Sequence, residues 1–371
     1  MTKKNHKITF QHFLILLFLS VHVLSSSQEL KNPIYYGVDY FLLEGTKIPD
    51  SLKENRYDRL PLSYKEIVRK PVWDLSKASA GMSIRFLSNS TSISVKWTIL
   101  SNHKMYHMAE TGIKGVDLYF NNMGNWQYLN TAKPSAIENE YMLIKDMPDE
   151  MREFRMYLPL YDGVARIEIG IDSNSVIERP LKKNRGSIIF YGTSITQGGC
   201  ASRPGMAHTN IISRKLNVDC INFGFSGNGR MEQPINDLIS EFKPLFYVIE
   251  CLPNMIAEQV TSRTIPLVKT IQAKRPETPI IFIENFIYES SALDEKRGAL
   301  INVKNAALKT EYIKMIEGGY KNIYYISSEN ATGEDHEGTV DGVHFTDLGF
   351  IRYADFLIDK FVKFGLITKE D

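Results

Sequence analysis

Cysteine is scarce in this chain, which holds only Cys200, Cys220 and Cys251 among its 371 residues. The three form no C-x-x-C pair and no zinc-type spacing, which excludes a disulfide scaffold, a zinc finger and a thioredoxin-like motif. All three lie near the ends of predicted central strands, so we expect buried free thiols. A disulfide between two of them is the alternative after export, and the odd number would leave one thiol over.

An excess of charge of one sign is also lacking, because 44 Lys and Arg stand against 43 Asp and Glu, a net charge of +1. The basic residues are scattered along the chain, as on a solvated surface. This balance argues against a nucleic-acid partner and against docking on an anionic membrane surface.

Long hydrophobic runs are absent beyond the N-terminus. There, three lysines within the first seven residues precede the apolar run 13–19, and the segment ends in the serines 25–27. This pattern predicts a secretory signal peptide over residues 1–27, and hence an exported protein, periplasmic or secreted, with no membrane insertion after cleavage. The apolar run is short for a membrane span, although an uncleaved anchor is the alternative.

The remaining chain changes character near residue 180. Short β-rich runs separated by Asn, Ser, Gly and Asp predict an antiparallel, jelly-roll-like β-sandwich over residues 28–180. From residue 186 to 371, apolar strands alternate with helix-length stretches, which predicts an α/β domain with a parallel sheet. Pro180 and the basic run 182–185 indicate a short exposed linker. We expect two separate folding units that pack against each other, with the loop 103–111 the best candidate for a wall of a cleft. The runs that carry this prediction are 83–86, 92–97, 115–120 and 165–170 in the first half, and 187–191, 221–224, 245–250, 279–284 and 322–326 in the second.

Four short segments of the second half, 192–194, 225–227, 253–254 and 341–344, hold the residues with chemical potential. Ser194 follows the apolar run 187–191, so it lies at the C-terminal end of a predicted strand, where open α/β sheets bind ligands. A serine alone is a weak nucleophile until a base takes its proton and a third group orients that base.

His344 can be that base, and Asp341, three residues earlier, can hold its other ring nitrogen if the residues between them form a turn. A final helix is expected to begin near Asp347. An oxyanion needs hydrogen-bond donors, and these could be the backbone N–H groups of Ser194 and Gly227 together with the side-chain amide of Asn254.

In this order after successive strands, Ser194, Gly227, Asn254 and His344 resemble the four signature residues of the SGNH (GDSL-like) hydrolase superfamily. The resemblance covers residues 186 to about 365 and implies a flavodoxin-like α/β/α fold and ester hydrolysis without a metal or another cofactor. Thr193 departs from the pattern, because the superfamily often has Asp at this position. Since that residue is not the nucleophile, the departure bears on local hydrogen bonding at the turn.

The run 115–119, Gly-Val-Asp-Leu-Tyr, resembles the G-x-D-L-Y signature of a β-domain found upstream of SGNH-type esterases in many bacteria. The same two-domain plan is similar to that of carbohydrate esterases in which a jelly-roll module flanks the hydrolase. The resemblance therefore implies a serine esterase acting on acylated carbohydrate, with acetyl as the favoured acyl group.

Two other functions stay open. A lipase or thioesterase of the same superfamily would use the same residues with a longer apolar acyl pocket, which the sequence does not reveal. A non-catalytic glycan-binding protein is the alternative from another class, although a pure binder would have no need of Ser194, Asp341 and His344 together. The glycines of 224–229 are spaced G-x-x-G-x-G, which does not fit a dinucleotide loop.

Some further polar residues are weaker candidates. Arg203 and His208 follow the nucleophile closely and could touch substrate, or could serve the helix that follows. His103 and His107 lack the Glu of a zinc-binding H-E-x-x-H helix, so a zinc site is the weaker explanation. A hydrogen-bonded histidine or one that borders the cleft is the stronger, and His107 is the candidate for contact with substrate. Trp97 ends an alternating strand, which favours core packing over stacking on a sugar ring.

Overall fold

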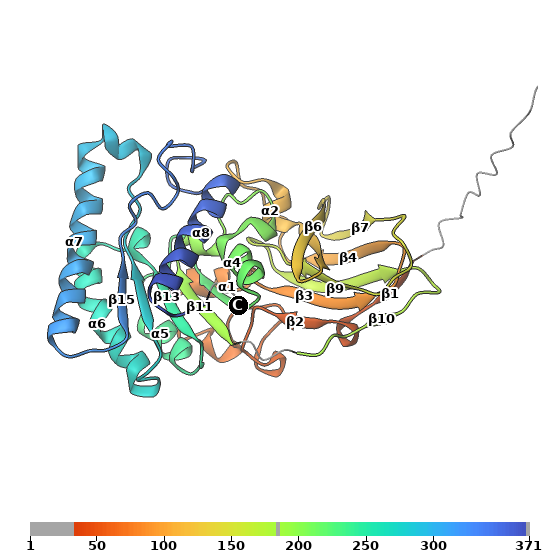
Figure 1. The fold of residues 1–371 in the computed structure, drawn as a ribbon, viewed down its shortest axis with the longest axis horizontal. Helices are drawn as coiled ribbons and strands as arrows, with labels where there is room; N and C mark the ends of the chain where they lie inside the picture. The colour runs from red at the N-terminus through yellow and green to blue at the C-terminus, as the bar shows by residue number, and fades with distance from the viewer. Residues whose placement is uncertain (1–32, 183–185, 369–371) are drawn as a thin grey trace, which may run out of the picture. The chain divides into compact units, whose positions relative to one another are not determined.

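The computed structural model describes residues 33–182 and 186–368 of the chain (Figure 1). The predicted signal peptide, residues 1–27, lies outside this part, as do residues 183–185 of the predicted linker. No helix within the described ranges is long and apolar enough to cross a membrane.

The N-terminal half is built from two antiparallel sheets, as the sequence predicts. One sheet has the order β1-β9-β4-β7, and the other has the order β10-β3-β8-β5-β6 with β2 paired to β3. Strand β4 shows why the sheets stack, because Trp97 faces inward and is buried while its neighbours Lys96 and Thr98 are partly exposed. The strands are β1 (Ile34–Tyr36), β2 (Leu42–Glu44), β3 (Ser83–Ser88), β4 (Ile93–Ile99), β5 (Val116–Asn122), β6 (Asn125–Ala132), β7 (Glu138–Ile144), β8 (Arg152–Tyr157), β9 (Val164–Ile171) and β10 (Ile177–Glu178).

The C-terminal half contains one parallel sheet of five strands in the order β12-β11-β13-β14-β15. Every residue of the inner strand β11 is buried, because helices cover both faces of the sheet. The strands are β11 (Ser187–Gly192), β12 (Asp219–Gly224), β13 (Phe246–Glu250), β14 (Ile280–Ile283) and β15 (Ile323–Ile326). This arrangement is the predicted flavodoxin-like α/β/α fold.

Two groups of helices form the outer layers of this domain (Figure 1). Helices α5 (Gln233–Ser240), α6 (Ala257–Lys274) and α7 (Glu295–Glu317) pack on one face of the sheet. Helices α4 (His208–Leu216) and α8 (Asp347–Lys363) pack on the other. Helix α8 begins where the sequence predicts, because the Thr346 hydroxyl caps it by accepting the Gly349 N–H.

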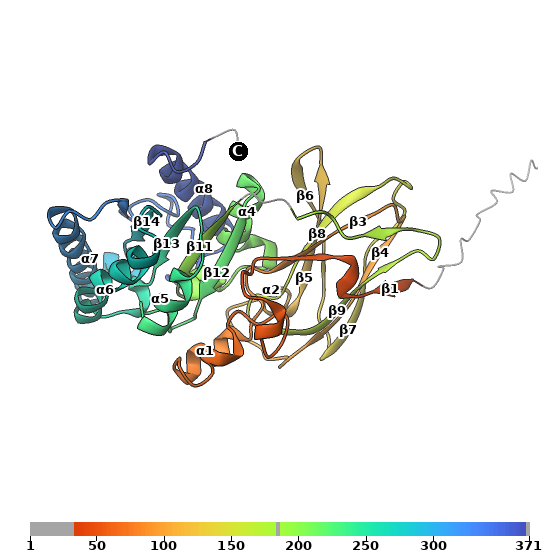
Figure 2. The same cartoon turned by 90° about the horizontal axis from the view of Figure 1, so that it is seen from below.

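A segment of the N-terminal half leaves the sandwich and packs on the parallel sheet (Figure 2). This crossing segment, residues 45–81, contains helix α1 (Lys70–Ser76) and connects β2 to β3. Its apolar side chains Val72 and Trp73 lie in the same core as Ile221 of β12. The sequence pattern predicts this segment to belong to the β-sandwich. Tyr57 does pack in the sandwich core, whereas Val72 and Trp73 pack in the α/β domain.

Candidate active site

Ser194 begins the short helix α3 (Ser194–Gln197) directly after β11 and Thr193. The turn is fixed by the backbone N–H of Thr193, which donates to the Thr196 hydroxyl oxygen at 3.2 Å. Gly192 is required here, since a Cβ at this position would lie 1.9 Å from the Thr196 hydroxyl oxygen. The turn places the Ser194 hydroxyl at the C-terminal edge of the sheet, with 7% of the residue exposed.

His344 and Asp341 meet Ser194 from the loop that precedes α8. The Nε2 atom of His344 lies 2.9 Å from the Ser194 Oγ, and its Nδ1 lies 2.8 Å from an Asp341 carboxylate oxygen. The spacing of three residues works because Gly342 takes a left-handed conformation, φ 81°, that turns the chain back on itself. The three residues that the sequence singles out therefore form one continuous chain of hydrogen bonds.

The Asp341 carboxylate is held in its ionised form. Its second oxygen accepts the backbone N–H groups of Val343 and His344, at 3.1 and 2.8 Å. Partial burial alone would raise the pKa of Asp341, but these hydrogen bonds and the contact with the His344 ring outweigh burial and lower it. A carboxylate that stays ionised fixes the Nδ1–H tautomer of His344, which leaves Nε2 free to accept a proton.

Three hydrogen-bond donors near Ser194 have no acceptor among the described residues. They are the backbone N–H groups of Ser194 and Gly227 and the side-chain amide of Asn254. Gly227 has a left-handed conformation, φ 70°. The Asn254 carbonyl oxygen accepts the Gly229 N–H at 3.3 Å, which leaves its NH₂ group for another partner. Such unpaired donors are what an oxyanion would need.

The N-terminal half also reaches this site. His107 comes from the predicted loop, and its ring centroid lies 5.6 Å from that of His344. Tyr161, which follows β8, donates its hydroxyl to the Ser194 carbonyl oxygen at 3.4 Å. Burial raises the pKa of Tyr161, so its hydroxyl stays protonated and able to donate. The sequence gives no signal for Tyr161, because no motif surrounds it.

The G-x-D-L-Y run acts as a contact between the two halves. Asp117 is fully buried and accepts the Gly205 N–H at 2.8 Å and the Arg203 guanidinium at 2.9 Å. The Tyr119 hydroxyl oxygen accepts a hydrogen bond from the same guanidinium. The Cζ atom of Arg203 lies 3.8 Å from the centroid of the Tyr128 ring. Arg203 is thus engaged by the sandwich, which does not fit the predicted contact with substrate.

His208 does not fit that role either. Its side chain is fully buried, and its Nε2 lies 3.3 Å from the carboxylate of Glu250 at the end of β13. The same carboxylate accepts the hydroxyls of Thr196 and Tyr353. Burial would raise the pKa of Glu250, but His208 and these hydroxyls lower it. Helix α4 begins at His208, and the ring of His208 is buried. Through the shared carboxylate of Glu250, His208 helps to hold Thr196 in the turn that carries Ser194.

The cysteines and Trp97, which the sequence analysis also considers, are buried. Cys200, Cys220 and Cys251 are all buried free thiols. Burial, and then the nearby Asp341 carboxylate, raises the pKa of Cys200 to about 12, which keeps this thiol neutral beside the site. Trp97 is buried in the sandwich core and donates its indole N–H to the Lys114 carbonyl oxygen at 3.0 Å.

Two arginines of the crossing segment contact the loop that carries Gly227, and the sequence analysis missed both. Arg59 is buried and donates to the Gly224 carbonyl oxygen at 2.6 Å. Arg69 donates to the side chain and the carbonyl oxygen of Asn228. Burial lowers the pKa of Arg59 to about 9.

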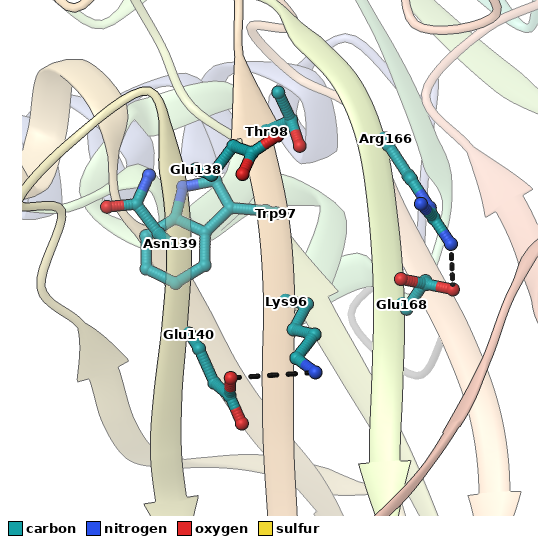
Figure 3. Close-up of a pocket in the computed structure, with 8 residues that line it drawn as sticks. All are labelled: Lys96, Trp97, Thr98, Glu138, Asn139, Glu140, Arg166 and Glu168. Carbon is teal, nitrogen blue, oxygen red and sulfur yellow. Dashed lines mark hydrogen bonds and ion pairs between the residues drawn. The ribbon is translucent and has the colours of Figure 1, made fainter.

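A pocket of about 370 Å³ lies on the sandwich, across β4, β7 and β9 (Figure 3). Its charged side chains largely satisfy one another: Lys96 lies 3.5 Å from Glu140 and Arg166 lies 2.7 Å from Glu168. None of the lining residues belongs to the group around Ser194, so this pocket is separate from the candidate active site.

Two known protein families match this chain. Residues 185–362 match the GDSL-like lipase/acylhydrolase family, and residues 35–177 match the GxDLY family, described as the N-terminus of SGNH-hydrolase-type esterases. The chain belongs to the GDSL-like lipase/acylhydrolase family and carries the GxDLY domain at its N-terminus. The resemblance stated from the sequence is thereby confirmed. No curated protein matches the chain.

Several solved structures share the fold. A Bacteroides ovatus protein named as a GDSL-like lipase is 33% identical, with a TM-score of 0.87 over 91% of this chain and 99% of that one. The salicylyl-acyltransferase SsfX3 of a tetracycline biosynthetic pathway is 14% identical, with a TM-score of 0.74 over 90% of this chain and 98% of that one. An acetyl xylan esterase of Butyrivibrio proteoclasticus is 11% identical, with a TM-score of 0.57 over 91% and 100%. The last two likenesses concern the fold alone.

Proposed function

We propose that this protein is an exported serine esterase that removes small O-acyl groups, acetyl foremost, from carbohydrate. The observation that carries the proposal is the hydrogen-bonded chain from Ser194 through His344 to Asp341, beside three unpaired donors. A serine with a positioned base and an oriented third group is the arrangement that activates a hydroxyl for acyl transfer.

In the first half of the proposed reaction, the Ser194 Oγ attacks the ester carbonyl carbon while His344 Nε2 takes the hydroxyl proton. The C–O bond to the sugar then breaks, and His344 returns the proton to the departing sugar hydroxyl. Asp341 stabilises the imidazolium that forms between these steps. In the second half, His344 takes a proton from water as the water oxygen attacks the acyl carbon. The bond to the Ser194 Oγ then breaks, His344 returns the proton to that oxygen, and the acid is released.

The carbonyl oxygen gains negative charge in both tetrahedral intermediates. The N–H groups of Ser194 and Gly227 and the Asn254 amide would donate to it. Because these donors are held by the turns around them before substrate arrives, they would need little rearrangement as charge develops. The Gly229 N–H keeps the Asn254 amide oriented.

Support for a small acyl group and a sugar substrate comes from two directions. His107, which approaches Ser194 from the N-terminal half, has a ring nitrogen without a partner among the described residues that would suit a sugar hydroxyl. The same two-domain fold occurs in an acetyl xylan esterase and in a family two carbohydrate esterase from Clostridium thermocellum solved with cellohexaose. A lipase or thioesterase activity and non-catalytic glycan binding are the alternatives.

The test combines two substrate panels with the Ser194→Ala variant as the control. On nitrophenyl esters of increasing chain length, kcat/KM should be highest for acetyl and fall as the chain lengthens. On defined acetylated polysaccharides, the wild-type protein should release acetate and Ser194→Ala should not. A preference for long acyl chains would favour the lipase alternative, and binding to glycan without acetate release would favour the glycan-binding one.

Export rests on the basic and apolar pattern of residues 1–27. In cells that express the full chain, N-terminal sequencing should find a mature protein that begins near residue 28, in the periplasm or the medium. An intact N-terminus in the membrane fraction would support the uncleaved anchor instead.

A further inference from the structure

Three potential metal ligands from distant parts of the chain meet beside Ser194. His107, Cys200 and His344 each offer one ligand atom, and these atoms all lie within 4.8 Å of one another. His107 belongs to the sandwich half, Cys200 to the loop after α3, and His344 to the loop before α8. Imidazole nitrogen and thiolate sulfur are the ligands that Zn²⁺ and similar thiophilic cations prefer.

The three ligand atoms, which lie within 4.8 Å of one another, would have to draw closer together to hold such a cation. Zn–N bonds of about 2.1 Å and Zn–S bonds of about 2.3 Å in a tetrahedron place neighbouring ligand atoms about 3.5 Å apart. The Nδ1 atom of His107 is buried and has no hydrogen-bond partner among the described residues. Cys200 has a left-handed backbone, φ 71°, which a residue with a side chain adopts only when its surroundings impose it. The unpaired ring nitrogen of His107 and the constrained Cys200 thus lie together with His344, their ligand atoms within 4.8 Å of one another.

We propose that a thiophilic divalent cation such as Zn²⁺ binds to His107, Cys200 and His344 and reversibly inhibits the enzyme. The inhibitory part of this proposal rests on the proposed function. On binding, the Cys200 thiol releases its proton to solvent as the metal–sulfur bond forms. The lone pair of His344 Nε2 goes to the metal, so Ser194 loses the acceptor for its proton.

Metal binding is measured directly, without reference to activity, by calorimetric titration of the wild-type protein with Zn²⁺. One Zn²⁺ should bind per chain, and Cys200→Ser and His107→Gln should each weaken binding at least tenfold. His103→Gln is the matched control, because His103 lies in the same loop and contacts Ser101 instead of the cluster. Unchanged affinity in Cys200→Ser, or equal loss in His103→Gln, would overturn the proposed site.

Inhibition is measured on an acetyl ester with Zn²⁺ and with Zn²⁺ followed by a chelator. Wild-type activity should fall with the same concentration dependence as binding and return after chelation, while Cys200→Ser should need at least tenfold more Zn²⁺. Stoichiometric binding that leaves hydrolysis unchanged would contradict the assignment of His344 as a ligand. A protein that binds Zn²⁺ at this cluster but hydrolyses no ester would refute the proposed function and leave the metal site standing.

A second inference rests on different contacts, those of the crossing segment with the loop around Gly227. Arg59 donates to the carbonyl oxygens of Asn222 and Gly224, on the N-terminal side of Gly227. Arg69 donates to Asn228, on the C-terminal side of Gly227, and also pairs with Glu232 at 2.6 Å. The loop that presents the Gly227 N–H is therefore held at both ends by residues far away in the sequence.

We infer that Arg59 and Arg69 are positioning residues that fix the Gly227 N–H for the transition state, an inference that rests on the proposed function. A misplaced donor would weaken a bond made mainly as charge develops, so kcat should fall while KM stays the same. Arg59→Met removes a buried side chain and is prone to unfold. The Arg69 side chain is 36% exposed and gives the cleaner test.

The experiment compares Arg69→Met with Lys70→Met, a neighbouring exposed position whose ammonium pairs only with Asp74 among the described residues. Arg69→Met should lower kcat ten- to a hundredfold with KM within twofold, Arg69→Lys should recover part of the loss, and Lys70→Met should change neither constant. In the background of Asn254→Ala, the Arg69 effect should shrink, because the two changes act on one oxyanion. A pure rise in KM, full additivity, or an unchanged kcat in a folded Arg69→Met would overturn the inference, while a failure of Ser194→Ala to abolish activity would refute the function itself.

Discussion

The sandwich and the α/β domain differ in which parts of the chain supply their hydrophobic cores. The sandwich core consists of residues between Phe41 and Ile177, all from the N-terminal half. The α/β domain borrows apolar side chains from that same half on both faces of its sheet. The borrowed residues are Ile48, Leu60, Val68, Val72 and Trp73 on one face, and Ala80, Met108, Ile113 and Leu160 on the other.

This difference shows that the order of domains along a chain does not tell how they depend on each other. The N-terminal half supplies more than a wall to its neighbour, because it also contributes His107 and Tyr161 to the site and Arg59 and Arg69 to the loop of Gly227. The expectation of two separate folding units therefore needs a direct test, and the structure favours one cooperative unit.

The largest effect is expected from removing the N-terminal half. Residues 186–371 alone would expose the faces that the borrowed side chains cover, and burying one large apolar side chain is worth about 1.5–3 kcal/mol. Several such losses compare with the about 5–15 kcal/mol that stabilises a typical domain. We expect this fragment to be unfolded by near-ultraviolet circular dichroism and inactive even on a small activated ester.

The control for this fragment is the chain 28–371, prepared in the same way. Cooperative unfolding of the fragment, with turnover of a small ester near that of the control, would show that the domains fold separately, as the sequence pattern alone suggests.

Within the site, the next largest effect is expected from Asp341→Asn. The amide cannot stabilise the imidazolium and favours the wrong tautomer of His344, so kcat should fall about ten-thousand-fold. The measurement is kcat on an acetyl ester, with Asp335→Asn as the control because Asp335 lies in the same loop and pairs with Arg352. A loss below tenfold in Asp341→Asn would mean that another group orients the base.

A smaller effect is expected from Asn254→Ala. The amide would bond mainly the charge that develops in the transition state, so kcat should fall about a hundred- to a thousandfold with little change in KM. Steady-state kinetics on the same ester measure both constants. A change confined to KM would instead make Asn254 a residue that binds the substrate in its ground state.

Much of the fold follows from the sequence because its signals are local. Alternation predicts β4 and β9, continuous apolar runs predict β11 and β13, and the change between the two patterns marks two architectures. The weaker alternation around β7 and β8 gives no comparable signal, and those strands are held by pairing with β4 and β3.

In the candidate site, too, some residues have a local sequence signal and others have none. Ser194, His344 and Asp341 can be found because each follows a strand or precedes a helix and their order matches a known signature. The sequence leaves two roles open for Arg203 and His208, contact with substrate or support of the helix that follows, because nearness to Ser194 in sequence does not tell which way a side chain points. The contact of Arg59 with Gly224 joins residues from different halves, so only the folded chain reveals it.

The central claim is that Ser194 is the nucleophile, and the most direct measurement is kcat of Ser194→Ala on an acetyl ester. We expect a loss of about a million-fold, because removing the nucleophile of such a unit costs as much as removing the whole triad. The variant should unfold at the same temperature as the wild-type protein. If the folded variant kept more than about a tenth of the wild-type turnover, another residue would have to carry out the attack and the account of this site would be wrong.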